Sequence, residues 1–209
     1  MDFPIVPAKT GLVFFDTLKI YLDPEDPQER AAVQRSGVVA RMQRLNQACR
    51  AAGIAVFYPA ADHRPDGRDF APHLADAPFH LPAGQGPGPT MPPPVRGGTR
   101  GAEVIDELAP QPGDYMIKKH RWSSFFQTHL ELSLRTAGID TLILSGGAVE
   151  VGVASTAYSA RDRDFSLIIV RDACTARDEQ SNTAFMDLIF PPFARVMTVD
   201  QIVAAIAAR

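Results

Sequence analysis

The chain has 209 residues, a formal net charge of −3 and 45% hydrophobic residues, which suits one compact domain over residues 1–209 with a sizeable core. The slightly acidic charge gives no reason to expect nucleic acid as a partner, and no apolar run approaches the roughly 20 residues that span a bilayer. The N-terminus shows no secretory signal and the two cysteines form no disulfide or metal-binding pattern, so we expect a cytoplasmic protein.

Strands and helices are predicted to alternate along the whole chain. Short continuous apolar runs are typical of buried parallel strands, and the segments between them have the spacing of helices that cover a sheet. The pattern predicts an α/β protein with a three-layer, mostly parallel, doubly wound six-stranded sheet of the Rossmann-like type. The strands are expected at 11–15, 54–58, 114–119, 142–144, 165–170 and 195–198, and the helices at 28–52, 101–108, 127–137, directly after Gly152, at 178–190 and at 199–207.

The first predicted strand ends at Asp16. A carboxylate directly after a buried strand lies where α/β enzymes hold their catalytic groups, because ligands bind at the carboxyl ends of the strands. The alternative is that Asp16 caps the turn that follows, as aspartate often does.

The predicted helix at 28–52 has one apolar face, formed by residues three or four positions apart: Val38, Met42, Leu45 and Cys49. Since Cys49 belongs to this face, we expect its side chain to pack in the core rather than to react.

Residues 59–100 are rich in proline and glycine and show little periodicity. A long irregular segment inside a compact domain is usually functional, and we expect a lid or rim over a pocket. Arg64, Arg96 and Arg100 in this segment are available to bind an acidic substrate.

The same segment contains His63, His73 and His80, which raises the question of a metal site. Zinc sites draw several ligands from characteristic spacings such as C-x-x-C and H-E-x-x-H, and none surrounds these histidines. We therefore expect no metal and no cofactor.

The predicted strand at 114–119 ends in Lys118 and Lys119, and a cluster of charged and then aromatic residues follows. A lysine just past the carboxyl end of a central strand can pair with a carboxylate from another strand. The alternative is that both lysines extend into solvent.

The turn at 146–152 (GGAVEVG) joins an apolar strand to a helix of small residues. Strand ends and helix N-termini converge at such a turn, so it is the expected floor of a ligand site. No Ser, Cys or Thr stands at the start of the helix, where a nucleophile would normally be presented.

Three segments at matching relative positions resemble the isochorismatase-like (cysteine hydrolase) superfamily. They are 11–16 (GLVFFD), 119–128 (KHRWSSFFQT) and 146–156 (GGAVEVGVAST), and residues 96–101, 108–114 and 172–174 are similar as well. The resemblance implies an isochorismatase-like fold, a hydrolase that acts on a small anionic substrate, and assembly into homo-oligomers, either dimers or tetramers. It also implies a general acid/base role for Asp16, a catalytic role for Lys119 and a cis peptide bond between Gly147 and Ala148. The residues expected to bind the substrate are Gly147, Ala148, Glu150, Val151, Trp122, Arg121, Phe126, Tyr21, His63 and Arg96.

One departure from the superfamily concerns the catalytic position at Gly152. Amidases of the superfamily have a cysteine there, and without a thiol no thioester can form. Cys174 follows a different predicted strand, and we expect it to be a small packed residue. Isochorismatases also have glycine at this position and hydrolyse a vinyl ether by protonation of a carbon and attack of water. The resemblance therefore implies a cysteine-less hydrolase with Asp/Lys acid–base chemistry.

Two other functions remain open at this point. The first is a C–N hydrolase, acting on an amide or ureide, in which Asp16 or Glu150 activates water. The second is a non-catalytic relative that binds a ligand in the same pocket. Glu150 itself has an alternative interpretation, as a solvent-facing residue in the first turn of a helix, where the helix dipole favours a carboxylate.

Overall fold

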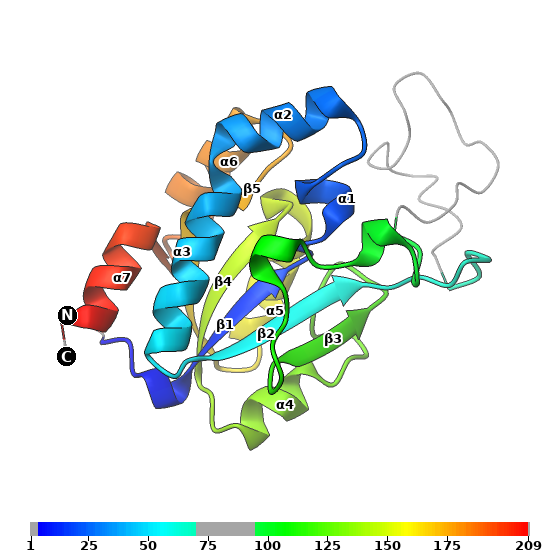
Figure 1. Cartoon of the computed structure of the whole chain (residues 1–209). Coiled ribbons are helices and arrows are strands. Elements are labelled where there is room, and N and C mark those ends of the chain that lie inside the picture. The colour runs from blue at the N-terminus through cyan, green and yellow to red at the C-terminus, as the bar shows by residue number, and fades with distance from the viewer. Residues whose placement is uncertain (1–3, 70–94, 209) are drawn as a thin grey trace.

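The computed structural model describes residues 4–69 and 95–208, and its centre is a parallel sheet with the strand order β3-β2-β1-β4-β5-β6 (Figure 1). Every neighbouring pair of strands is parallel. This arrangement confirms the predicted doubly wound α/β fold. The strands are β1 (Thr10–Phe15), β2 (Ala55–Ala61), β3 (Tyr115–Lys119), β4 (Thr141–Gly147), β5 (Ser166–Thr175) and β6 (Arg195–Met197).

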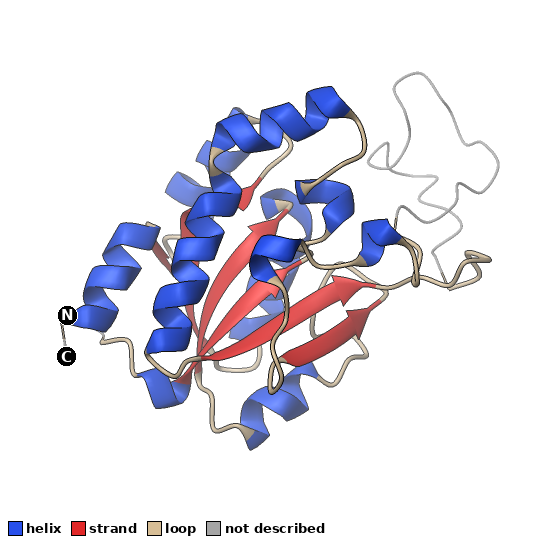
Figure 2. Ribbon diagram, viewed as in Figure 1, coloured by secondary structure: helices blue, strands red, loops and turns tan. Residues whose placement is uncertain are grey.

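Helices cover both faces of the sheet and form the outer layers (Figure 2). Successive side chains of a strand point to opposite faces, so Leu12 and Phe14 of β1 pack on one side and Val13 and Phe15 on the other. The first face is covered by α3 (Val38–Ala51) and α7 (Val199–Ala207), and the second by α4 (Leu130–Thr136), α5 (Ala154–Arg161) and the segment around Met186 and Phe190.

The sheet is built in two halves that meet at the neighbouring strands β1 and β4. From β1 the chain winds outward through β2 to β3, and it then returns to β4 beside β1 and winds outward through β5 to β6. Open α/β sheets bind their ligands at such a switch point, beyond the carboxyl ends of the strands. Phe15 at the end of β1 pairs with Gly146 of β4, so Asp16 and the turn at 146–152 both lie at this point.

The predicted helix at 28–52 is wrong as a single element, because it is two helices. They are α2 (Pro27–Ser36) and α3, and Gly37 between them has φ 67°, a left-handed conformation that glycine adopts without steric cost. The predicted apolar face belongs to α3 alone, and Cys49 is buried in it as expected. Preceding α2 is a short helix, α1 (Lys19–Leu22), that the sequence pattern did not indicate.

Three other predicted helices are shorter or differently built. The segment 101–108 holds two 3₁₀ turns, η3 (Arg100–Ala102) and η4 (Asp106–Leu108). The helix expected at 127–137 begins only at Leu130. That expected at 178–190 is α6 (Glu179–Ala184) followed by a π-helical turn, η6 (Phe185–Ile189). A short 3₁₀ turn, η1 (Pro7–Lys9), precedes β1. Within the described ranges, no helix has both the length and the apolar content required to cross a membrane.

Three predicted boundaries at strand ends also change. The fourth strand was expected at 142–144, but β4 continues to Gly147. The fifth strand was expected to end at Val170, but β5 continues to Thr175, so Cys174 lies in a strand and not in a loop. At the start of the predicted lid, Pro59 to Ala61 belong to β2, and at its end Val95 is buried against Leu18. The stretch 70–94, which includes His73 and His80, lies outside the described residues.

The C-terminal helix α7 provides a test of local stability. Thr198 caps this helix: the hydroxyl of Thr198 accepts the N–H of Gln201, and the side chain of Gln201 accepts the N–H of Thr198. Thr198→Ala removes one half of this capping box, so we expect a loss of about 1 kcal/mol in the free energy of unfolding. Urea unfolding would measure it, with unchanged enzymatic activity as the control, because α7 lies away from the switch point.

Candidate active site

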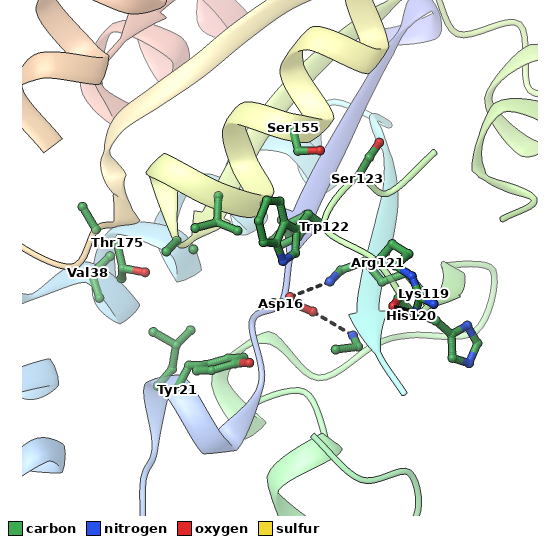
Figure 3. Close-up of a pocket in the computed structure, with 18 of the residues that line it drawn as sticks. Asp16, Tyr21, Val38, Lys119, His120, Arg121, Trp122, Ser123, Ser155 and Thr175 are labelled. Carbon is green, nitrogen blue, oxygen red and sulfur yellow. Dashed lines mark hydrogen bonds and ion pairs between the residues drawn. The ribbon is translucent and has the colours of Figure 1, made fainter. Parts of the chain in front are cut away.

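A pocket of about 980 Å³ lies at the switch point, beyond the carboxyl ends of β1, β3, β4 and β5. Its lining comes from six parts of the chain: the end of β1, helices α1 to α3, the end of β2 with His63, the end of β3 with the loop that follows it, the turn after β4 with the start of α5, and the end of β5. Figure 3 shows Asp16 and Lys119 between Tyr21 on one side and Trp122 on the other.

Asp16 is held at the centre of the pocket by two hydrogen bonds. One carboxylate oxygen accepts the backbone N–H of Ala61 at 2.7 Å, and the other accepts Nζ of Lys119 at 2.7 Å (Figure 3). The backbone of Asp16 has φ 47°, a left-handed conformation that aspartate tolerates better than most residues. These partners lie at the ends of β2 and β3, so the carboxylate does not cap the turn that follows it.

Lys119 reaches Asp16 from two strands away. Side chains alternate along β3, so Lys118 points outward to pair with Asp62, whereas the side chain of Lys119 is only 5% exposed. Strands lie about 4.8 Å apart, so a side chain that crosses β2 to reach β1 must span a distance on the order of 10 Å. The long Lys119 side chain, the 2.7 Å hydrogen bond and the Asp16 side chain span this distance together, and the Lys119 ammonium also lies 4.2 Å from the centre of the Phe15 ring.

The pocket raises the pKa values of two groups, Asp16 and Tyr21. Burial raises the pKa of the Asp16 carboxyl above its ordinary value of 3.8, and the opposing effects of Lys119 and of the Ala61 N–H do not cancel the rise. Burial, together with the negative charge of Asp16, also raises the pKa of the Tyr21 phenol, which therefore stays protonated. A carboxyl group with a raised pKa can carry a proton closer to neutral pH than an exposed aspartate can.

The loop at 120–126 forms one wall of the pocket. Arg121 donates hydrogen bonds to the backbone carbonyls of Asp69 and His120, while Trp122 and Phe126 are about half exposed. The loop is fastened to α5, because the hydroxyl of Thr156 accepts the N–H of Ser124 at 3.0 Å. The predicted residues Arg121, Trp122 and Phe126 all line the pocket.

His63 is buried in the pocket lining next to His120. Its Nδ1 lies 3.6 Å from a carboxylate oxygen of Asp69. Burial lowers the pKa of His63, and the nearby His120 and Lys119 add to this effect while Asp69 opposes it, so the ring favours its neutral form. Within residues 4–69 and 95–208, no group of three or more His, Cys, Asp or Glu side chains is arranged to hold a metal ion.

The turn after β4 has the backbone geometry that the resemblance implies. The Gly147–Ala148 peptide bond is cis, and a π-helical turn, η5 (Val149–Val153), leads directly into α5. Both glycines are needed here: a side chain on Gly146 would collide with the carbonyl of Phe15, and one on Gly147 with the hydroxyl of Thr175. Gly147, Ala148, Val151 and Gly152 line the pocket.

Neither cysteine is a candidate nucleophile in this structure. Cys49 and Cys174 are both buried and neither lines the pocket. Burial raises the pKa of each thiol to about 12, so the reactive thiolate is scarce at neutral pH.

Two residues expected to bind the substrate do not line the pocket. One carboxylate oxygen of Glu150 accepts the backbone N–H of Arg177 at 3.0 Å, and Glu150 is not among the residues that line the pocket. Arg96 is exposed and also lies outside the lining. Of the other arginines expected to be available, Arg64 pairs with Asp66 and Arg100 with Asp23. The arginine among the described lining residues is Arg121.

The apolar side of the pocket was not predicted from the sequence. Leu22, Val33 and Val38, from α1, α2 and α3, face the cavity together with Tyr21. The proline and glycine residues between positions 24 and 37 indicate that this segment is divided into short helices. Only the fold shows that these helices contribute residues to the pocket at the switch point. Phe15 was also missed, although it directly precedes Asp16.

Comparison with known proteins decides the family. The family model described as the isochorismatase domain matches residues 10–201. The chain belongs to the isochorismatase family. It is 30% identical over 193 residues to the uncharacterized isochorismatase family protein YwoC of Bacillus subtilis, covering 92% of each chain. Members of the isochorismatase family are hydrolases, and this chain is therefore a hydrolase.

Relatives with more specific names are named for different functions. The phenazine biosynthesis protein PhzD1 of Pseudomonas aeruginosa is 29% identical over 202 residues, which cover 94% of this chain and 86% of PhzD1. The ureidoacrylate amidohydrolase RutB of Methylobacterium radiotolerans is 32% identical over 176 residues, with coverages of 80% and 67%. Among solved structures, an isochorismatase family protein from Burkholderia thailandensis superimposes with a TM-score of 0.79 at 28% identity, over 99% of this chain and 100% of that chain.

Proposed function

We propose that this isochorismatase-family hydrolase cleaves a small anionic substrate by acid–base chemistry of Asp16 and Lys119, without a side-chain nucleophile. The observation that carries the proposal is the buried pair of Asp16 and Lys119, 2.7 Å apart, beside a turn whose residue 152 is glycine. Hydrolysis of a vinyl ether, the isochorismatase-type reaction, fits these groups.

Asp16 is the proposed proton donor. Its carboxyl would give a proton to the terminal carbon of the enol ether, which leaves an oxocarbenium ion. Water would then attack the carbon that bears the ether oxygen and return a proton to Asp16. The hemiketal that results would break into a keto acid and an alcohol. No bond between substrate and enzyme is needed, so glycine at position 152 is compatible with this reaction. The raised pKa of Asp16 supports the role of donor.

Lys119 and the turn after β4 are the proposed groups that orient the substrate. The Lys119 ammonium would attract a substrate carboxylate and keep Asp16 in place, while backbone N–H groups near the Gly147–Ala148 bond would bind a carboxylate or a developing oxyanion. Among the described lining residues, Asp16 is the one acidic side chain, whereas Lys119 and Arg121 are cations. This balance of charge favours an anionic substrate.

The apolar side of the pocket indicates the chemical character of the uncharged portion of the substrate. Tyr21, Leu22, Val33 and Val38 line the cavity, and Figure 3 shows Tyr21 and Val38 on the side away from Arg121 and Ser123. We infer that the substrate presents a ring or short hydrocarbon portion to these side chains and its charged portion to Lys119.

A second candidate is hydrolysis of a C–N bond, favoured by the 32% identity to RutB, which is named as a ureidoacrylate amidohydrolase. Here a deprotonated Asp16 would activate water as a general base. Glu150 is a poor candidate for this role, because its carboxylate is bonded to the Arg177 N–H and lies outside the pocket lining.

A substrate panel would test the proposal. The purified protein would be incubated with isochorismate, with pyruvate release measured, and with ureidoacrylate and N-carbamoyl amino acids, with ammonia release measured. We expect pyruvate from isochorismate. Ammonia release without pyruvate would overturn the vinyl-ether proposal in favour of C–N hydrolysis, and no product from either group would contradict both.

The pH dependence of kcat/KM should reveal the role of Asp16. If Asp16 donates a proton, its protonated form is the active one. The rate is then highest below its raised pKa and falls about tenfold for each pH unit above that value. A general base would give the opposite slope, with the rate rising through the same pKa. Initial rates between about pH 4 and pH 9 would distinguish the two signs.

A further inference from the structure

The space that a side chain at position 152 would need is already filled. A Cβ built on Gly152 would lie less than 3.0 Å from both Cε1 and Cζ of Phe15, and 3.1 Å from Cε2. Real Cβ atoms essentially never come that close to another heavy atom, so either the ring or the turn would have to move. Gly152 has no left-handed φ, which means that its backbone conformation does not require glycine.

Phe15 has little freedom to move away. It is 2% exposed and packs in the core cluster that includes Val149 and Val153 of the same turn and Leu144 of β4. On its pocket side the ring lies 4.2 Å from Nζ of Lys119, a distance at which the ring face attracts a cation. The ring therefore lies between the turn and the ammonium group.

From this geometry we propose that Phe15 is the specificity-determining residue that keeps this site free of a side-chain nucleophile. Its ring takes the place of a side chain at position 152 and forms the floor on which the reacting part of the substrate lies beside Asp16 and Lys119. A nucleophile can be presented at position 152 only if residue 15 is made smaller. The inference deepens the proposed function and rests on it for the placement of the substrate on the Phe15 ring. The test of the inference needs no substrate.

The first arm of the test is the thermal stability of four proteins: the natural protein, Gly152→Ala, Phe15→Ala and the double variant. We expect Gly152→Ala to lower the melting temperature of the natural protein by about 5 °C or more, because the methyl group meets the ring. In the Phe15→Ala background the same methyl group enters the vacated space, so we expect no loss or a gain. Equal losses in both backgrounds, or none in either, would overturn the proposal.

The second arm places a thiol at the same position and measures its reaction with iodoacetamide. The thiolate attacks the methylene carbon and displaces iodide, and intact-mass spectrometry counts the added groups. We expect Phe15→Ala/Gly152→Cys to be labelled at least tenfold faster than Gly152→Cys, in which the thiol has no room in the pocket. Cys49 and Cys174 should add little background, since both are buried with a pKa of about 12.

A matched control comes from Ser155, which lines the same pocket from α5. Ser155→Cys should be labelled at rates within about twofold with and without the Phe15→Ala substitution, which shows that the reagent enters both pockets equally. If Gly152→Cys is labelled as fast as the double variant, Phe15 does not exclude a side chain there and the inference is wrong. If labelling follows the expectation but isochorismate is not cleaved, the proposed reaction fails while the role of Phe15 stands.

Discussion

Replacing Asp16 with asparagine should lower kcat by about a thousandfold or more, whichever bond the enzyme cleaves. Asparagine has nearly the same shape and can still accept the N–H of Ala61, but it can neither donate a proton to carbon nor accept one from water. Removal of a general acid or base typically costs between about 10² and 10⁴ in rate. The measurement is steady-state turnover of the best substrate from the panel, with circular dichroism to show that the variant is folded.

A matched control for this variant is Asp62→Asn. Asp62 follows β2 and pairs with Lys118 outside the pocket lining, so its kcat should stay within about twofold of the natural value. Substantial turnover by Asp16→Asn, with both variants equally folded, would contradict every acid–base mechanism centred on Asp16.

Replacing Lys119 with methionine should reduce both activity and stability. Methionine fills much of the same space but leaves the buried Asp16 carboxylate without its cation. Breaking a buried ion pair by removal of one partner typically costs about 3–5 kcal/mol, and we expect a loss of that size in the free energy of unfolding at about pH 8. We also expect kcat/KM to fall by about 100-fold or more, because the substrate loses its main cation and Asp16 its positioning contact.

The pH dependence of this loss identifies its cause. Without Lys119, the pKa of Asp16 in the folded protein rises further above its value in the unfolded chain. A carboxyl with a raised folded pKa gives stability that is present at low pH and is lost as the pH rises through that pKa. The difference in free energy of unfolding between Lys119→Met and the natural protein should therefore shrink toward about pH 4.

The neighbouring lysine supplies the control for Lys119→Met. Lys118 lies on the same strand but its side chain is 77% exposed, and its ion pair with Asp62 is one that solvent screens. Lys118→Met should change the free energy of unfolding by less than about 0.5 kcal/mol, with no dependence on the state of Asp16. A loss in Lys119→Met that is equally large at all pH values would point to lost packing instead of an unpaired carboxylate.

Most of the predicted fold depends on patterns that are local in the sequence. Apolar runs fixed the place of all six strands, and Asp16 and Lys119 were recognised because each comes at the carboxyl end of such a run. The predicted element boundaries were wrong where the hydrophobic pattern does not reveal how the backbone continues. Gly37 divides one amphipathic segment into two helices, and β5 continues for five residues beyond its apolar run.

By itself, the sequence determined the α/β class, the edge of the sheet that holds the site, and an acid and a cation at two strand ends. Only the tertiary structure decided that Asp16 and Lys119, 103 positions apart, meet across β2, and that the ring of Phe15 occupies the side-chain space of residue 152. It also decided that Glu150 and Arg96 lie outside the pocket lining. The reason is physical: hydrophobic periodicity records which face of an element is buried, but strand order and side-chain packing determine which buried faces touch.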